Sequence, residues 1–289
     1  MIVSLLQRDI IWADPAANRQ RADEALRALP PSDLIVLPEM FSTGFATQPV
    51  GIAESADSPT LAWMRRVARE RDCAVAGSVA VGVDDRQWAS ATPAEGGGQA
   101  GLGAALRYVN RFYFVTPDGR EVHYDKRHLF TYGGEHLHYS PGDRRVIAQW
   151  RGVRIRLLVC YDLRFPAWCR NLAADDVADD ATLATADGAY DLALVVASWP
   201  SSRVEAWDAL LRARAIENQC YVAGVNRVGT DPLCQYPGSS AFIDPYGRVA
   251  ASCGRDRECA TTAELDLDRL RAFRRKFPVL ADADAFRLL

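Results

Sequence analysis

Residues 34–39 read Leu-Ile-Val-Leu-Pro-Glu, an unbroken apolar run that stops at a proline and a carboxylate. A run without polar alternation is typical of a strand that is buried on both faces of a sheet. Apolar residues at helical spacing precede it at 22–29 and follow it at 61–68, and a further apolar strand comes next at 73–83. This alternation of strand and helix predicts a layered α/β protein.

The second half of the chain has the same alternation. Apolar runs at 153–159, 191–197 and 220–225 indicate strands, and 204–218 has helical spacing. The turn motifs Pro117-Asp118-Gly119 and Pro245-Tyr246-Gly247 predict two hairpins. Because no linker separates the halves, we expect a single domain, residues 1–289, with two sheets and helices outside them.

Two internal segments and the C-terminal part of the chain remain to be assigned. Residues 84–106, with Gly96-Gly97-Gly98, and residues 173–189, rich in Ala and Asp, lack periodicity and are expected to be surface insertions. A last strand is expected at 261–267. The polar tail beyond Arg269 should dock on the outside of the protein or on a partner.

Composition narrows the classes of function. The 289 residues carry a formal net charge of −3 and a pI of about 5.9, so we expect no nucleic acid or anionic membrane partner. Seven cysteines without a Cys-x-x-Cys pair indicate a reduced, cytoplasmic protein. No apolar run approaches the roughly 18 residues of a membrane span, and residues 1–8 do not resemble a signal peptide.

The basic residues are almost all arginine, and Lys126 and Lys276 are the only lysines. A lysine that persists in such a composition is a candidate for a place where the compact ammonium is needed. Lys126 follows a hairpin strand, just as Glu39 and Cys160 follow apolar strands. Because ligands and catalytic groups collect at the carboxyl ends of strands, the combination of these side chains predicts a site.

Each of the three residues also has an ordinary interpretation when it is taken alone. Glu39 could be a helix cap or a surface carboxylate, and Cys160 could be a small core residue. Lys126 could form a surface ion pair with Asp125 or Glu135.

Three segments resemble the glutamate, lysine and cysteine motifs of the nitrilase (carbon–nitrogen hydrolase) superfamily. They are LPEMFSTGF at 37–45, YDKRHLF at 124–130 and LLVCYDLRFP at 157–166, and the segments at 212–229 and 238–249 extend the likeness. The resemblance implies a four-layer α-β-β-α sandwich, a homodimer, a small-molecule amide substrate, and no cofactor or metal. His136 and His138 match no strong zinc pattern.

The resemblance also implies roles for individual residues. Cys160 is the nucleophile, Glu39 is the general base, and Lys126 with the backbone N–H of Tyr161 holds the oxyanion. A second glutamate of the family corresponds to Glu135, which orients the lysine and the substrate. The start of a helix after Cys160 should favour its thiolate form.

Candidate substrate contacts surround these motifs. Arg164, four residues after Cys160, suits a substrate carboxylate, although an internal salt bridge is an equal alternative. Aromatic residues next to the motifs could wall a pocket or simply pack in the core: Phe45, Phe130, Tyr132 and Trp199.

The segments CYDLRFP (160–166), SWP (198–200) and RKFP (275–278) are most similar to those of omega-amidases. We therefore expect hydrolysis of the terminal amide of small 2-oxo dicarboxylic acid omega-amides, through a thioester. An N-carbamoyl amine or a nitrile is the alternative substrate for the same Glu-Lys-Cys site. A non-catalytic binding or scaffold protein on the same fold is the alternative from another class.

Overall fold

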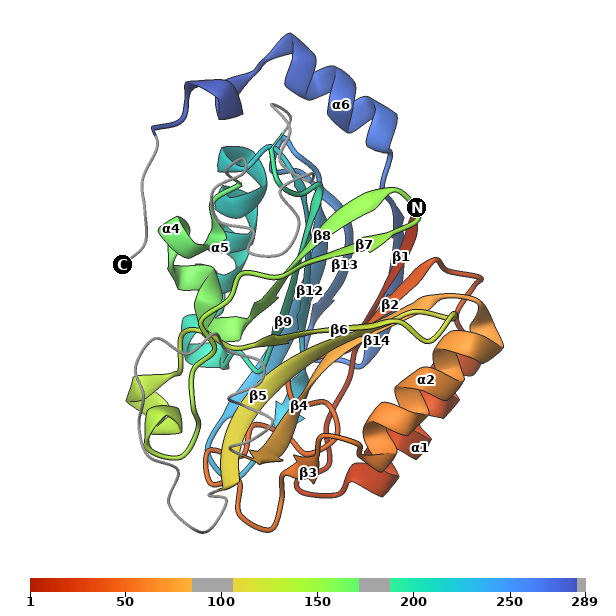
Figure 1. Cartoon of the computed structure of the whole chain (residues 1–289), viewed down its shortest axis with the longest axis vertical. Coiled ribbons are helices and arrows are strands. Elements are labelled where there is room, and N and C mark those ends of the chain that lie inside the picture. The colour runs from red at the N-terminus through yellow and green to blue at the C-terminus, as the bar shows by residue number, and fades with distance from the viewer. Residues whose placement is uncertain (85–105, 172–187, 285–289) are drawn as a thin grey trace.

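The computed structural model of the chain describes residues 1–84, 106–171 and 188–284. Within these residues two seven-stranded sheets lie face to face, and helices cover both outer faces (Figure 1). The arrangement is the four-layer α-β-β-α sandwich that the sequence predicted. In the part of the chain that the structure describes, no helix has the length and apolarity to cross a membrane.

The first sheet has the strand order β14-β1-β2-β4-β5-β6, with β3 paired to β4. Strands β1, β2 and β4 run parallel, whereas β5, β6 and β14 join by antiparallel pairing. Two helices cover the outer face, and each begins at a proline behind a capping side chain, Asp14 or Ser58. The bounds are β1 Ile2–Gln7, α1 Pro15–Arg27, β2 Leu34–Val36, β3 Glu54–Ser55, α2 Pro59–Arg71, β4 Ala74–Asp84, β5 Leu106–Val115, β6 Glu121–Asp125 and β14 Cys259–Glu264.

The second sheet has the order β11-β12-β10-β9-β8-β7, with β13 paired to β12. Strands β8, β9 and β10 are parallel, and α5 packs on β10 and β12 from outside. The bounds are β7 Ile147–Trp150, β8 Val153–Val159, α4 Pro166–Cys169, β9 Leu192–Ala197, α5 Val204–Glu217, β10 Tyr221–Asn226, β11 Val228–Thr230, β12 Gln235–Ile243, β13 Val249–Arg255 and α6 Leu267–Lys276.

The main core lies between the two sheets. Fully buried side chains of the first sheet, such as Leu5 and Phe112, belong to the same apolar cluster as Ile155 and Val195 of the second sheet. A second cluster fills the space between the first sheet and its helices, and it includes Met64 of α2. Burial on both faces explains why the strands at 34–36 and 192–197 are continuous apolar runs.

Some expected boundaries were wrong. The last strand, expected at 261–267, is β14 and ends at Glu264, because Asp266 caps α6 by accepting a hydrogen bond from the Arg269 N–H. The tail does dock on the outside of its own chain. Arg274 of α6 is buried, and its guanidinium donates to the Asp191 carboxylate, at 2.9 Å, and to the Tyr190 carbonyl, at 2.7 Å.

The two predicted insertions, 84–106 and 173–189, lie largely outside the described residues. Their expected ends were wrong, however. Asp84 and Leu106 are paired in the ladder of β4 and β5, and Ala189 is buried in the main core. The hairpins predicted around Gly119 and Gly247 are confirmed as β5–β6 and β12–β13.

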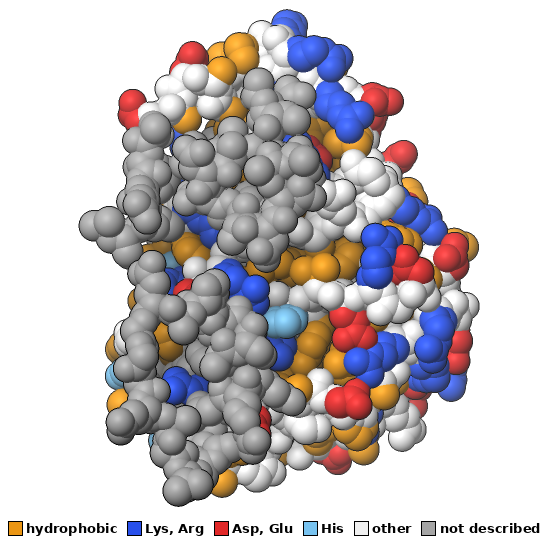
Figure 2. All heavy atoms as spheres, in the orientation of Figure 1, with side chains coloured by type: hydrophobic (Ala, Val, Ile, Leu, Met, Phe, Trp, Pro, Cys, Tyr) orange, Lys and Arg blue, Asp and Glu red, His pale blue; other side chains and the backbone are white. Residues whose placement is uncertain are grey.

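Charged side chains of both signs are intermixed on the face where α2 lies (Figure 2). Arg66 of α2, for example, pairs with Asp23 at 2.9 Å and with Glu70 at 2.7 Å. Arg65, also in α2, pairs with Asp57. Alternating charges of this kind suit a solvated helix face.

Candidate active site

The site lies where strands of both sheets end. Glu39 lies just beyond β2, and Lys126 follows β6 in the same sheet. Cys160 and Ser198 follow β8 and β9 of the other sheet. The first three of these residues are those that the sequence placed at strand ends, and the packing of the two sheets brings them together.

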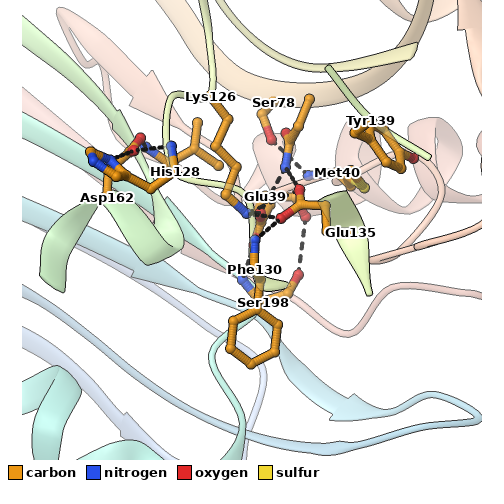
Figure 3. A network of polar contacts seen from close by, with 12 residues as sticks. Glu39, Met40, Ser78, Lys126, His128, Phe130, Glu135, Tyr139, Asp162 and Ser198 are labelled. Atoms are coloured by element: carbon orange, nitrogen blue, oxygen red, sulfur yellow. Dashed lines mark hydrogen bonds and ion pairs between the residues drawn. The ribbon is translucent and has the colours of Figure 1, made fainter. Parts of the chain in front are cut away.

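Lys126 is the centre of a buried ionic cluster (Figure 3). Its Nζ lies 2.9 Å from Glu39 Oε1 and 2.9 Å from Glu135 Oε2, and all three side chains are almost completely buried. A surface ion pair with Asp125 is therefore wrong, and Asp125 pairs with Arg111 instead. Burial alone would lower the pKa of Lys126, but the charges of Glu135 and Glu39 outweigh burial and raise that pKa above its ordinary value.

The Glu39 carboxylate is held by donors from both sheets. Oε1 accepts from Lys126 Nζ and, at 2.8 Å, from Asn110 Nδ2 of β5. Oε2 accepts from the Ser198 backbone N–H, at 2.7 Å, beyond β9. Three donors on a buried carboxylate fix its orientation, and the surface and helix-cap interpretations of Glu39 are therefore wrong.

Glu135 holds the other side of the ammonium. It lies in a short 3₁₀ turn, Glu135–Leu137, and its Oε2 accepts a 2.6 Å hydrogen bond from the Phe130 N–H. Its Oε1 accepts from Asn110 Nδ2 at 3.3 Å. Burial raises the pKa of Glu135, while Lys126 opposes that shift. Glu135 thus ties the loop after β6 to the ammonium.

Cys160 lies at a sharp turn between β8 and a 3₁₀ helix, Cys160–Arg164. Its φ of +47° is in the left-handed region, which costs a non-glycine residue of order 1 kcal/mol or more. The thiol lies near enough to Glu39 and Lys126 for both charges to act on its pKa. A side chain held by such a turn is aimed rigidly at its neighbours.

The expectation that a helix start favours the thiolate is wrong. Burial, followed by the negative charge of Glu39, raises the pKa of Cys160 well above its ordinary value. The segment that follows is a 3₁₀ turn and then the four-residue helix α4, too short to offset both effects. Burial and the charge of Glu39 therefore favour the neutral thiol.

Asp162 connects the cysteine turn to the lysine loop. Its buried carboxylate accepts from Val159 N at 2.9 Å and from Tyr124 Oη at 2.7 Å. It also accepts from His128 N at 3.0 Å (Figure 3). His128 Nδ1 adds a contact of 2.8 Å. The two segments that carry Lys126 and Cys160 are thus held in a common frame.

A cavity of about 420 Å³ opens beside this cluster, and Cys160 lines it. All the sequence-predicted substrate residues line the same cavity: Phe45, Phe130, Tyr132, Tyr161, Arg164 and Trp199. Trp199 is 2% exposed, whereas Tyr132 is 84% exposed, so the cavity runs from the core to the surface. Its volume suits a small-molecule ligand.

Several residues of the site were missed in the sequence. Asn110 is fully buried in β5, but Arg107 and Arg111 lie in the same strand, so a polar residue at 110 does not stand out in the sequence. Ser198 contributes a backbone N–H, which leaves no signal in a sequence. Arg203 also lines the cavity, but a single arginine does not stand out in an arginine-rich chain.

Within the described ranges, no group of three or more His, Cys, Asp or Glu side chains could hold a metal ion. The arrangement offers a thiol that lines the cavity, a carboxylate beside it, and an ammonium that is bound to that carboxylate. These are the parts of a hydrolase with a thiol nucleophile.

A family model described as carbon-nitrogen hydrolase matches residues 2–275, so the chain belongs to this family.

Individual relatives agree with this assignment. The chain is 44% identical to omega-amidase YafV of Escherichia coli strain K12, over 99% of this chain and 98% of the relative. It is 33% identical to 2-oxoglutaramate amidase of Bacillus subtilis strain 168, over 97% and 96%. The crystal structure of XC1258 from Xanthomonas campestris, a CN-hydrolase superfamily protein with an arsenic adduct in the active site, has a TM-score of 0.86 and 40% identity, covering 100% of this chain and 98% of that one.

Proposed function

We propose that this chain is an omega-amidase that releases ammonia from the terminal amide of small 2-oxo dicarboxylic acid omega-amides, such as 2-oxoglutaramate. The observation that carries the proposal is the position of the Cys160 thiol beside a buried Glu39 carboxylate that binds Lys126. The likeness to omega-amidase YafV and to 2-oxoglutaramate amidase supports the substrate class.

The charges in the cluster set the order of the first step. Two carboxylates and one ammonium leave a single net negative charge, and a thiolate formed by losing its proton to solvent would add a second one in a buried place. Transfer of the Cys160 proton to Glu39 as sulfur attacks the amide carbonyl keeps the net charge constant, because the negative charge that Glu39 loses appears on the oxyanion. Glu39 therefore acts as general base during the attack.

The later steps use the same residues. Lys126 and the Tyr161 backbone N–H hold the oxyanion, and loss of one such donor typically costs roughly 3 kcal/mol. The C–N bond breaks as protonated Glu39 gives its proton to the leaving nitrogen, so ammonia departs and a thioester remains on Cys160. Glu39 then takes a proton from water, whose oxygen attacks the thioester, and the carboxylate product and free thiol are released.

Glu135 is proposed to act through Lys126, whose ammonium it holds from the side opposite Glu39. The aromatic side chains Phe45, Phe130, Tyr132 and Trp199 would wall the substrate chain, and Arg164 would bind its carboxylate. An N-carbamoyl amine or a nitrile could meet the same cluster, but one without an acid group would leave Arg164 without a carboxylate partner. A non-catalytic role would not explain why the charges of Glu39, Lys126 and Glu135 are buried, which costs free energy.

We also propose that the protein is a cytoplasmic homodimer that pairs through a helical face.

The test measures ammonia release from 2-oxoglutaramate, N-carbamoyl amino acids and nitriles by the wild type and by Cys160→Ala. The variant should lose all detectable turnover of 2-oxoglutaramate, because the thioester cannot form. Mass spectrometry of quenched wild-type enzyme should show an acyl group on Cys160. Cys259→Ala, which removes a half-buried thiol on β14, should retain wild-type turnover. Wild-type activity in Cys160→Ala would disprove the mechanism, and preference for nitriles or carbamoyl compounds would disprove the substrate class.

A further inference from the structure

The cavity beside Cys160 carries two arginines, Arg164 and Arg203, and no acidic side chain is among the described residues that line it. Arg164 belongs to the 3₁₀ turn after β8, and Arg203 ends another 3₁₀ turn, Ser201–Arg203, after β9. Two cations from separate turns thus face one small space. Such an excess of positive charge in a cavity favours an anionic ligand.

Each guanidinium rests on an aromatic wall. The Cζ of Arg164 lies 4.8 Å from the ring centroid of Trp199. The Cζ of Arg203 lies 5.2 Å from the ring of Phe130 and 5.6 Å from the ring of Tyr132. Contact with a ring face holds an arginine in place while leaving the N–H groups in its plane available to a ligand.

Those N–H groups have no protein acceptor in the parts of the chain that the structure describes. Neither Arg164 nor Arg203 forms a side-chain hydrogen bond or an ion pair there, although both are half-buried. Other partly buried or buried arginines behave differently: Arg214 donates to the Leu163 carbonyl and Arg274 to Asp191. The unmet donors of the cavity arginines therefore distinguish them from arginines with a packing role.

We infer that Arg203 is a specificity-determining residue that, together with Arg164, binds the acidic end of the substrate. This inference rests on the proposed omega-amidase function and extends it to a residue outside the sequence motifs. Two guanidinium groups offer more donors than one carboxylate can accept in a bidentate pair. A 2-oxo acid supplies a third acceptor oxygen next to its carboxylate, so the pair suits this end better than a plain carboxylate.

The test compares Arg203→Met, Arg164→Met and the double variant with the wild type, on 2-oxoglutaramate, on glutaramate and on neutral valeramide. Methionine retains an apolar stem against Phe130 and Tyr132 while removing the charge. Arg203→Met should lower kcat/KM for the two acidic amides by roughly 10- to 100-fold, with the larger loss for the 2-oxo acid. Its kcat/KM for valeramide should change by less than about threefold.

A second measurement separates binding from structure. In the Cys160→Ala background, calorimetric binding of 2-oxoglutaramate should weaken by a similar factor when Arg203→Met is added, and Arg203→Lys should restore part of it. Arg27→Met, which removes an exposed arginine at the end of α1, controls for a general loss of positive charge and should leave all rates unchanged.

The outcomes keep the two proposals apart. Equal losses on acidic and neutral amides, or none on either, would overturn the role of Arg203 while leaving the omega-amidase proposal standing. A wild type that turns over valeramide as well as 2-oxoglutaramate, still through Cys160, would overturn both. Selective loss on acidic amides with weaker calorimetric binding supports the inference.

Discussion

The Glu39 carboxylate has two opposite effects on the Cys160 thiol. Its charge stabilises the protonated thiol, and in the proposed reaction it accepts the thiol proton. Burial and the charge of Glu39 raise the pKa of the thiol, and Lys126 only partly opposes them. The residue that should remove the proton thus also holds the proton in place until substrate arrives. A thiol with a raised pKa should react slowly in oxidation and alkylation, which proceed through the thiolate.

Glu39→Gln should therefore lower the pKa of Cys160 while reducing hydrolysis by about 10²- to 10⁴-fold, because the general base is absent. With the negative charge gone, Lys126 becomes the dominant charge near sulfur. The thiol pKa is obtained from the pH dependence of the iodoacetamide alkylation rate in both proteins.

In the Glu39→Gln variant, a Cys160 thiol that reacts only at higher pH than in the wild type would contradict this account.

The Glu39→Gln variant should also have a free energy of unfolding lower by about 1–3 kcal/mol. The single oxygen of the new amide can still accept from Lys126 and Asn110, but its NH₂ group then meets the Ser198 N–H, which needs an acceptor. Urea unfolding measures that loss separately from activity.

At the residue scale, sequence was informative where a side chain departs from its surroundings. Lys126 stands out in an arginine-rich chain, and Glu39 and Cys160 interrupt apolar runs. Arg203 gives no such signal, because its role depends on the aromatic wall that the loop after β6 supplies. Nor could sequence give the direction of the Cys160 pKa, which depends on how deeply the sheets bury it.

At the scale of elements, the position of Lys126 depends on a close backbone approach. The Gly142 N–H donates to the Lys126 carbonyl at 2.9 Å, and the chain passes so near β6 that a Cβ at position 142 would overlap the Asp125 carbonyl. Backbone atoms cannot swing aside as a side chain can. The end of β6 would therefore have to move.

Gly142→Ala should lower kcat by about 10-fold or more, since displacement of Lys126 by even about 1 Å weakens the transition state contacts. The free energy of unfolding should fall by about 1–3 kcal/mol. Gly82→Ala is the matched control, because its Cβ would meet the Leu106 side chain at an ordinary 3.4 Å. It should retain kcat, and equal losses of kcat in both variants would refute the positioning argument.

The elements themselves were predicted well where a run was long and apolar, as for β8 and β9. The short strands β7 and β11 were missed, because four and three residues are too few to show a period. The predicted end of the last strand, just before α6, was wrong for another reason. Leu265 is a buried core residue beyond the end of β14, so the apolar pattern continues past the strand.

At the scale of the whole molecule, the chain encloses many thiols without disulfides. Burial raises the pKa of Cys73 to about 11 and that of Cys169 to about 12, and it also raises those of Cys220 and Cys253. A cysteine in an unfolded chain has a pKa of about 8.5. Above that pH the unfolded chain loses protons that the folded chain keeps, so the free energy of unfolding must fall as pH rises.

Between about pH 8.5 and pH 10 this fall should come mainly from cysteines, because unfolded tyrosines ionise only near pH 10. A fully titrated buried thiol contributes about 1.4 kcal/mol per pH unit. Cys169→Ala should therefore make the decline shallower by up to that amount, despite a lower stability at pH 7 from the lost side chain. Val79→Ala, another truncation in a buried part of the protein, should lower the curve without changing its slope. Urea unfolding with reductant present measures both curves, and parallel declines for the two variants would show that the Cys169 proton is not the cause.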